Sequence, residues 1–89
     1  MKTLEQIAPP NLSALNIAAL ARVIRRDWQK VYFGAAPYLH AMATLDKASD
    51  SYGYDSGKSI IRYFLANAST YRGPMAKAIK TELKRRLSE

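Results

Sequence analysis

Apolar side chains recur at steps of three and four residues in several stretches of this 89-residue chain, which is the spacing of an amphipathic α-helix. The first helix is predicted to begin between Ser13 and Asn16, where a polar residue can cap it, and to end at Gly34. Its apolar stripe consists of Ile17, Leu20, Ile24, Trp28 and Val31.

Two further helices are predicted behind prolines, because proline suits the first turn of a helix. Pro37 opens a short, half-exposed helix that reaches about Leu45. Pro74, which follows Gly73, opens a longer helix with lysines on one face. The apolar face of this longer helix consists of Met75, Ala76, Ile79, Leu83 and Leu87.

A third main helix is predicted from a cap at Asp55 or Ser56 to about Ala68, and we expect it to be the most buried helix. The segment 46–56 before it is rich in turn-forming residues and is predicted to be a long loop. No stretch alternates at period two. The predicted fold class is therefore all-α, a small irregular bundle of three main helices plus a shorter one.

The length and composition indicate a single helical domain over residues 1–89. Hydrophobic residues make up 48% and charged residues 24%, which is ordinary globular usage. Near the start, Thr3 and Gln6 have capping-box spacing, but Pro9 and Pro10 stop any helix that begins there. We expect residues 1–12 to form a loosely packed N-terminal arm.

Cellular context follows from what the sequence lacks. It contains no cysteine, which excludes a disulfide framework and a thiolate metal site. No apolar run approaches the length of a membrane span, and Glu5 stands where a signal peptide would be apolar. We therefore expect a cytoplasmic protein without membrane contact.

Two sets of residues suggest a phosphate-binding or metal-binding site, but neither has the residue spacing that such a site requires. The segment 53–59 ends in the Gly-Lys-Ser of a phosphate-binding loop, but it has three residues between its glycines where that loop requires four. His40 is the single histidine, and Asp46, Asp50 and Asp55 lack the spacing of a calcium loop. We therefore expect no enzyme, no metal site, no cofactor and no small-molecule substrate.

Basic residues carry more information. The formal net charge is +7, a balance that attracts nucleic acid or another acidic surface. Arg22 with Arg26 and Lys80 with Lys84 are like-charged at four-residue spacing, which costs about 0.2 to 0.5 kcal/mol per pair and roughly offsets the benefit of cations near a helix end. An anionic partner would explain both stripes, and it would do so best if they converge on one surface. The candidate nucleic-acid-binding residues are Arg22, Arg25, Arg26, Lys30, Arg72, Lys77, Lys80 and Lys84.

These patterns predict a small non-enzymatic binding protein that contacts DNA or RNA through basic helical faces. The contacts are expected to be mainly with phosphates, because exposed lysines suit phosphates better than base edges. The alternative is a protein–protein interaction module or a homodimeric accessory protein. Its candidate interface residues are Tyr52, Tyr54 and Tyr71, which lie in predicted loops and could equally cover the core.

Three stretches carry a resemblance. They are Asp27-Trp28 with Val31 to Leu39, then Tyr52-Gly53-Tyr54-Asp55-Ser56, then Tyr63 to Ala68. Together they resemble small uncharacterised proteins of bacteriophages and other bacterial mobile elements, over most of the chain. The resemblance implies a bacterial, cytoplasmic, accessory role. Because such proteins bind DNA or host proteins, it does not separate the two hypotheses.

Overall fold

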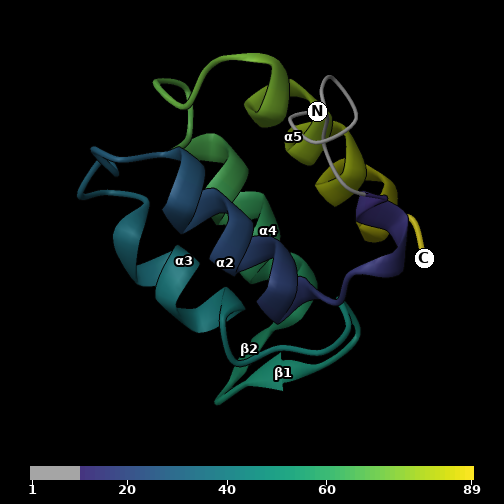
Figure 1. Ribbon diagram of the computed structural model, residues 1–89. Coiled ribbons are helices and arrows are strands. Elements are labelled where there is room, and N and C mark those ends of the chain that lie inside the picture. The colour runs from purple at the N-terminus through teal and green to yellow at the C-terminus, as the bar shows by residue number, and fades with distance from the viewer. Residues whose placement is uncertain (1–10) are drawn as a thin grey trace.

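The computed structural model describes residues 11–89, and most of this part of the chain is helical. The elements are η1 (Leu12–Ala14), α2 (Ile17–Asp27), α3 (Ala36–Met42), β1 (Ser51–Tyr52), β2 (Asp55–Ser56), α4 (Gly57–Ala66) and α5 (Pro74–Leu87). As Figure 1 shows, α3 packs against α2 and α4 on one side, and α5 packs against the same two helices on the other. The predicted helical fold is thus confirmed in outline.

A β-hairpin corrects the all-α prediction. β1 and β2 pair antiparallel within the segment that we predicted to be a loop, with Ser51 opposite Ser56 and Tyr52 opposite Asp55. Gly53 has a φ of +63°, as the first central residue of a type II′ turn requires. The strands are two residues long and exposed, so they have no buried face whose alternation could reveal them in the sequence.

The predicted helix starts are confirmed. They could be predicted because each depends on residues that are neighbours in the sequence. The Asn16 side chain accepts a hydrogen bond from the Ala19 amide at 2.8 Å. The Ser56 hydroxyl accepts one from the Ser59 amide at 3.1 Å. α5 begins at Pro74 directly after Gly73, in the order that the sequence predicts.

The predicted end of the first helix is wrong, since α2 stops at Asp27 and not at Gly34. The buried Trp28 ring stacks on Tyr71 with 5.0 Å between centroids and meets Phe64 edge-on at 6.2 Å. These contacts with distant parts of the chain bury Trp28, which caps α2 and whose amide donates to the Ile24 carbonyl at 2.7 Å. α3 likewise ends at Met42, before the predicted Leu45.

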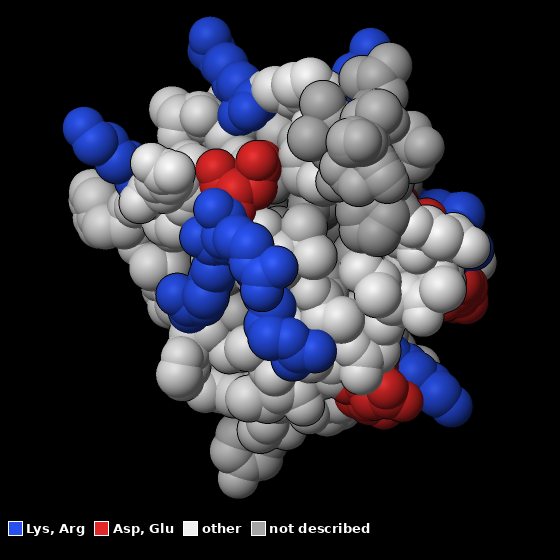
Figure 2. All heavy atoms as spheres, in the orientation of Figure 1, with Lys and Arg blue, Asp and Glu red and all other residues white. Residues whose placement is uncertain are grey.

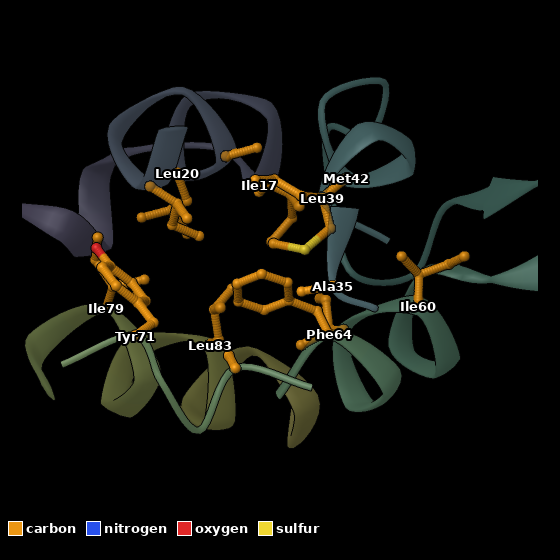
Figure 3. Packing of buried hydrophobic residues seen from close by; sticks show 14 of the residues in the cluster. Ile17, Leu20, Ala35, Leu39, Met42, Ile60, Phe64, Tyr71, Ile79 and Leu83 are labelled. Atoms are coloured by element: carbon orange, nitrogen blue, oxygen red, sulfur yellow. The ribbon is translucent and has the colours of Figure 1, made fainter. Parts of the chain in front are cut away.

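The core lies among α2, α3, α4 and α5. Figure 3 shows Ile17 and Leu20 of α2 facing Phe64 of α4 and Leu83 of α5 across the interior. All four of these side chains are fully buried. Each helix buries one face only, so the expectation that the helix now labelled α4 is more buried than the others is not confirmed.

The expected N-terminal arm needs a revised boundary. Leu12 is buried, and its carbonyl accepts a hydrogen bond from Arg86 at 3.0 Å, so this residue belongs to the packed domain. Residues 1–10, with the predicted Thr3–Gln6 turn, lie outside the described residues. In the described part of the chain, no helix has the length and apolar character to span a bilayer.

Candidate nucleic-acid interface

The first candidate surface is the exposed side of α2, which carries Arg22, Arg25 and Arg26 and which we call the arginine face. Because Ile17, Leu20 and Ile24 bury the opposite side, the helical period directs these arginines to solvent. Figure 2 shows blue side chains gathered over α2, whose only Lys and Arg residues are these three.

No arginine of this face forms an ion pair with a carboxylate among residues 11–89. Each guanidinium therefore keeps its five N–H donors for solvent or a ligand. Lys30, the next basic residue, is exposed in the turn that follows α2. The arginine face is thus a set of cations that the described fold does not neutralise.

The second candidate surface is an open cavity of about 330 Å³ where the loop before α5 meets the first turns of that helix. Its lining residues, which we call the basic pocket, are Tyr71, Arg72, Gly73, Ala76, Lys77 and Lys80. Three cations thus line one cavity. From the sequence, Lys77 and Lys80 can be recognised only as part of a basic helical stripe. Arg72 cannot be placed beside them, because the loop that carries it has no helical period.

Contacts with Tyr71 hold one wall of the pocket in place. The Lys80 ammonium donates a hydrogen bond to the Tyr71 carbonyl at 2.6 Å and lies 5.8 Å from the centre of the Tyr71 ring. The Arg72 guanidinium makes a long hydrogen bond of 3.4 Å to the Ser69 carbonyl, while Lys77 is exposed. The pocket therefore combines one anchored cation with two that are freer to turn toward a ligand.

The electrostatics of the pocket are those of an anion site. Burial, then the nearby Lys84 and Arg72 charges, lower the pKa of the Lys80 ammonium, because each disfavours its charged form. Among the described residues, no carboxylate forms an ion pair with Arg72, Lys77, Lys80 or Lys84. The first turn of α5 carries no acid either, so a bound anion would relieve the repulsion among these cations.

The two surfaces are linked through the core. Trp28, which directly follows α2, stacks on Tyr71 of the pocket wall, and both rings are buried. Asp27 lies near as well, since burial and then the Asp27 carboxylate raise the pKa of the Tyr71 hydroxyl. Arg72, Lys77 and Lys80 line one cavity, and no arginine of α2 is among its lining residues.

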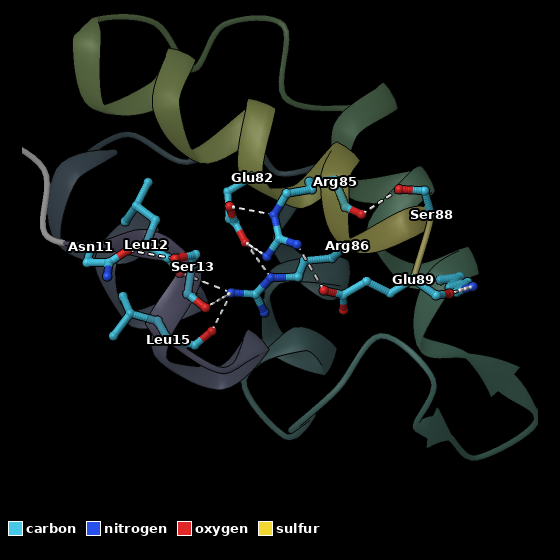
Figure 4. Close-up of polar contacts among 10 residues, drawn as sticks. Asn11, Leu12, Ser13, Leu15, Glu82, Arg85, Arg86, Ser88 and Glu89 are labelled. Carbon is cyan, nitrogen blue, oxygen red and sulfur yellow. Dashed lines mark hydrogen bonds and ion pairs between the residues drawn. The ribbon is translucent and has the colours of Figure 1, made fainter.

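In the last turn of α5, Arg85 and Arg86 serve the fold, whereas Lys84 is exposed and pairs with no described carboxylate. Arg86 is buried and pairs with Glu82, which stands four residues before it on the same helix face. Its guanidinium also donates to the carbonyls of Leu12 at 3.0 Å and Leu15 at 2.6 Å, as Figure 4 shows. Sequence reasoning missed this second role, although Arg86 continues the apolar stripe of Ile79 and Leu83 and so faces inward.

The candidate interface tyrosines separate into two groups. Tyr54 is fully exposed at the hairpin turn and Tyr52 is 40% exposed beside it. Tyr71 is 1% exposed, so its inclusion among the interface residues is wrong, and its ring packs in the core. The sequence missed Phe33, which is 81% exposed in the loop after α2, because an aromatic residue is ordinarily expected inside.

Other candidate chemistry finds no site in the described residues. No three side chains among His, Asp and Glu of residues 11–89 gather closely enough to hold a metal ion. Gly53 and Asp55 of the near-miss phosphate loop form the hairpin, and the Lys58 ammonium donates to the Glu89 carbonyl. What the described surfaces offer is exposed cationic side chains.

Comparisons with protein-family models, curated proteins and solved structures find no match to this chain. Function must therefore be argued from the arginine face and the basic pocket themselves.

Proposed function

We propose that this protein binds DNA or RNA, as a non-enzymatic protein, with the arginine face as the main contact to backbone phosphates and the basic pocket as a second contact. The observation that carries the proposal is the arginine face. Its three guanidinium groups are exposed on one side of α2 and pair with no described carboxylate.

The chemistry of the arginine face suits phosphate. Arginine offers a planar fork of donors that binds phosphate oxygens in pairs, and it stays charged at any physiological pH. Duplex DNA carries one negative charge per about 1.7 Å of its axis, whereas Arg22 and Arg26 are separated by one helical turn, or about 6 Å of helix axis. The face can therefore meet more than one phosphate at once.

The expected behaviour is strong salt dependence with little sequence preference. Each phosphate neutralised by a cation contributes about −0.9 to the slope of log affinity against log salt for duplex DNA. Three arginine contacts therefore predict a slope of about −3 from this face alone, and contacts at the basic pocket would make it steeper.

A matched pair of double variants tests the proposal. Arg22→Gln/Arg26→Gln removes two charges from the arginine face, and Lys47→Gln/Arg62→Gln removes two exposed charges elsewhere. Fluorescence anisotropy with labelled single-stranded and duplex oligonucleotides would be measured over a range of NaCl concentrations. The first variant should bind at least about ten-fold more weakly, with a slope smaller by about 1.8, while the second should stay within about two-fold.

Absence of binding at low salt would end the proposal. Equal losses in the two double variants would show attraction to net charge alone and would equally remove the role of the arginine face. Glutamine retains good helix propensity, so circular dichroism should show both variants folded.

A second candidate function is a protein-interaction module or a homodimeric accessory protein, with Tyr52 and Tyr54 at its interface. The fully exposed Tyr54 favours it, because a rigid aromatic side chain at a turn contributes contact area at low entropy cost. Sedimentation velocity of wild type and Tyr54→Ala at high salt distinguishes it. Salt-insensitive association that the variant lacks supports this candidate, whereas a strict monomer counts against a homodimer.

A bacterial, cytoplasmic role as an accessory protein of a phage or mobile element stays part of the proposal, since it fits either function.

A further inference from the structure

The basic pocket has features that a surface for backbone phosphates does not need. Lys77 and Lys80 stand three residues apart and so share one face of α5. Arg72 approaches from the preceding loop. Between them Gly73 has no side chain, and a Cβ built there would meet no described atom within 4 Å. The cations therefore surround a space that is open to a ligand.

The size and floor of the pocket indicate an organic group as well as an anion. Its volume is about 330 Å³, and sites for small organic ligands begin at about 300 Å³. Ala76 and Tyr71 lie beneath the cations and are each only 1% exposed. Tyr71 is held by its stack on Trp28, so this wall is preformed. A phosphate alone would leave most of the space empty, whereas a phosphate attached to a sugar and base would occupy it.

The charge of the pocket favours a phosphate monoester over a diester. A monoester carries about −1.5 to −2 at pH 7, whereas each linking phosphate of a nucleic acid carries one negative charge. Arg72, Lys77 and Lys80 line one cavity and pair with no described carboxylate. The repulsion among these cations is relieved more fully by the more highly charged group.

From these observations we infer that the basic pocket binds the phosphorylated end of a nucleic-acid strand, with the terminal nucleotide inside the pocket and the terminal phosphate between Arg72, Lys77 and Lys80. The inference rests on the proposed function and specifies its ligand.

The test compares oligonucleotides of one sequence that differ only at their ends. Anisotropy would be measured for a strand with a 5′-phosphate, one with a 3′-phosphate and one with hydroxyls at both ends. The variants are Lys77→Gln, which alters an exposed pocket residue without an ion pair in the described structure, and Lys47→Gln, an exposed lysine outside the pocket lining.

One terminal phosphate should strengthen binding at least about five-fold. Lys77→Gln should reduce that preference to less than about two-fold, while Lys47→Gln should retain it. The end that shows the preference identifies whether the pocket takes a 5′- or a 3′-phosphate.

Failure of the inference can be distinguished from failure of the proposed function. If the hydroxyl-ended strand binds through Arg22 and Arg26 but neither phosphate adds affinity, the inference is overturned and the function stands. If no strand binds, NMR titration with a nucleoside monophosphate examines the pocket directly. Shifts of the Gly73 to Lys77 resonances that inorganic phosphate fails to match support a nucleotide pocket, and their absence overturns it.

Discussion

At its amino end α5 presents Lys77 and Lys80 beside Arg72, with no carboxylate paired to them in the described chain. About two turns later the same helix carries Arg85 and Arg86, and both are paired with Glu82. The two ends are equally basic by composition. They differ in whether the described fold supplies a counter-charge, and for this reason we propose a binding role for the amino end alone.

At the carboxyl end of α5, Arg85 and Arg86 have a counter-charge and hydrogen-bond acceptors. Hydrogen bonding by Arg85 is the largest cause of the lowered pKa of Glu82, burial opposes it, and Arg86 adds to it. Arg86 further satisfies the carbonyls of Leu12 and Leu15, which attaches η1 to α5. Near the amino end of α5, Lys80 donates to the Tyr71 carbonyl and Arg72 makes a long hydrogen bond to the Ser69 carbonyl, but neither has a carboxylate partner in the described chain, and the pKa of Lys80 is lowered. Cations without a counter-charge are therefore a better guide to a candidate binding surface than the number of basic residues.

The largest expected effect concerns the satisfied end. Arg86→Ala leaves the Glu82 carboxylate with less compensation and three backbone carbonyls without their donor. We expect the free energy of unfolding to fall by about 3 kcal/mol, as for other buried pairs that lose one partner. Urea denaturation followed by circular dichroism measures it. A loss below about 1 kcal/mol would show that the Arg86–Glu82 pair behaves like an exposed ion pair. The contrast between the two ends of α5 would then fail.

The second expected effect is the opposite one at the amino end of α5, where a double variant should lose binding and keep its stability. Arg72→Gln/Lys77→Gln should weaken oligonucleotide binding about ten-fold or more, through the loss of two phosphate contacts. It should leave the free energy of unfolding within about 0.5 kcal/mol of wild type, because both side chains are exposed and neither forms an ion pair in the described structure. Anisotropy and urea denaturation are measured on the same sample. A marked loss of stability with intact binding would contradict the functional assignment.

A third effect is the pH dependence of stability. The pKa of Glu82 is lowered in the folded protein, so its pairing stabilises the fold above its ordinary pKa of 4.5 and is lost as the pH falls through the folded value. The unfolding free energy of wild type should therefore decrease below about pH 4.5. In Glu82→Gln this decrease should be smaller, in urea titrations at successive pH values. Identical profiles would show that the pair does not contribute to acid sensitivity.

The smallest effect examines the repulsion inside the pocket. Lys84 is the second cause, after burial, of the lowered pKa of Lys80. Lys84→Gln should therefore raise the pKa of Lys80 toward its ordinary value, and a bound nucleoside monophosphate should raise it too. NMR titration of the Lys80 side-chain carbon next to the ammonium follows both changes. An unchanged pKa in each case would show that neither the neighbouring cation nor the ligand acts on Lys80.

Local features of the sequence determine the helix starts and the side of each helix that carries the cations. Asn16, Ser56 and the Gly73-Pro74 pair act on their own neighbours through capping and backbone geometry, and each begins a helix as predicted. The arginines of α2 face solvent because the period of the helix places Ile17 and Leu20 on the other side. Such properties need no knowledge of the rest of the chain.

The tertiary structure decided what depends on distant residues. α2 ends at Asp27 although the apolar spacing continues through Trp28, and the exposed β-hairpin has no alternating buried face that could reveal it in the sequence. Packing also assigned the basic residues to different tasks. Arg86 reaches carbonyls that lie more than seventy residues away in the sequence, while Arg72 meets Lys77 and Lys80 around a cavity. Charge is a property of each residue, but whether it is neutralised depends on which groups the fold brings beside it.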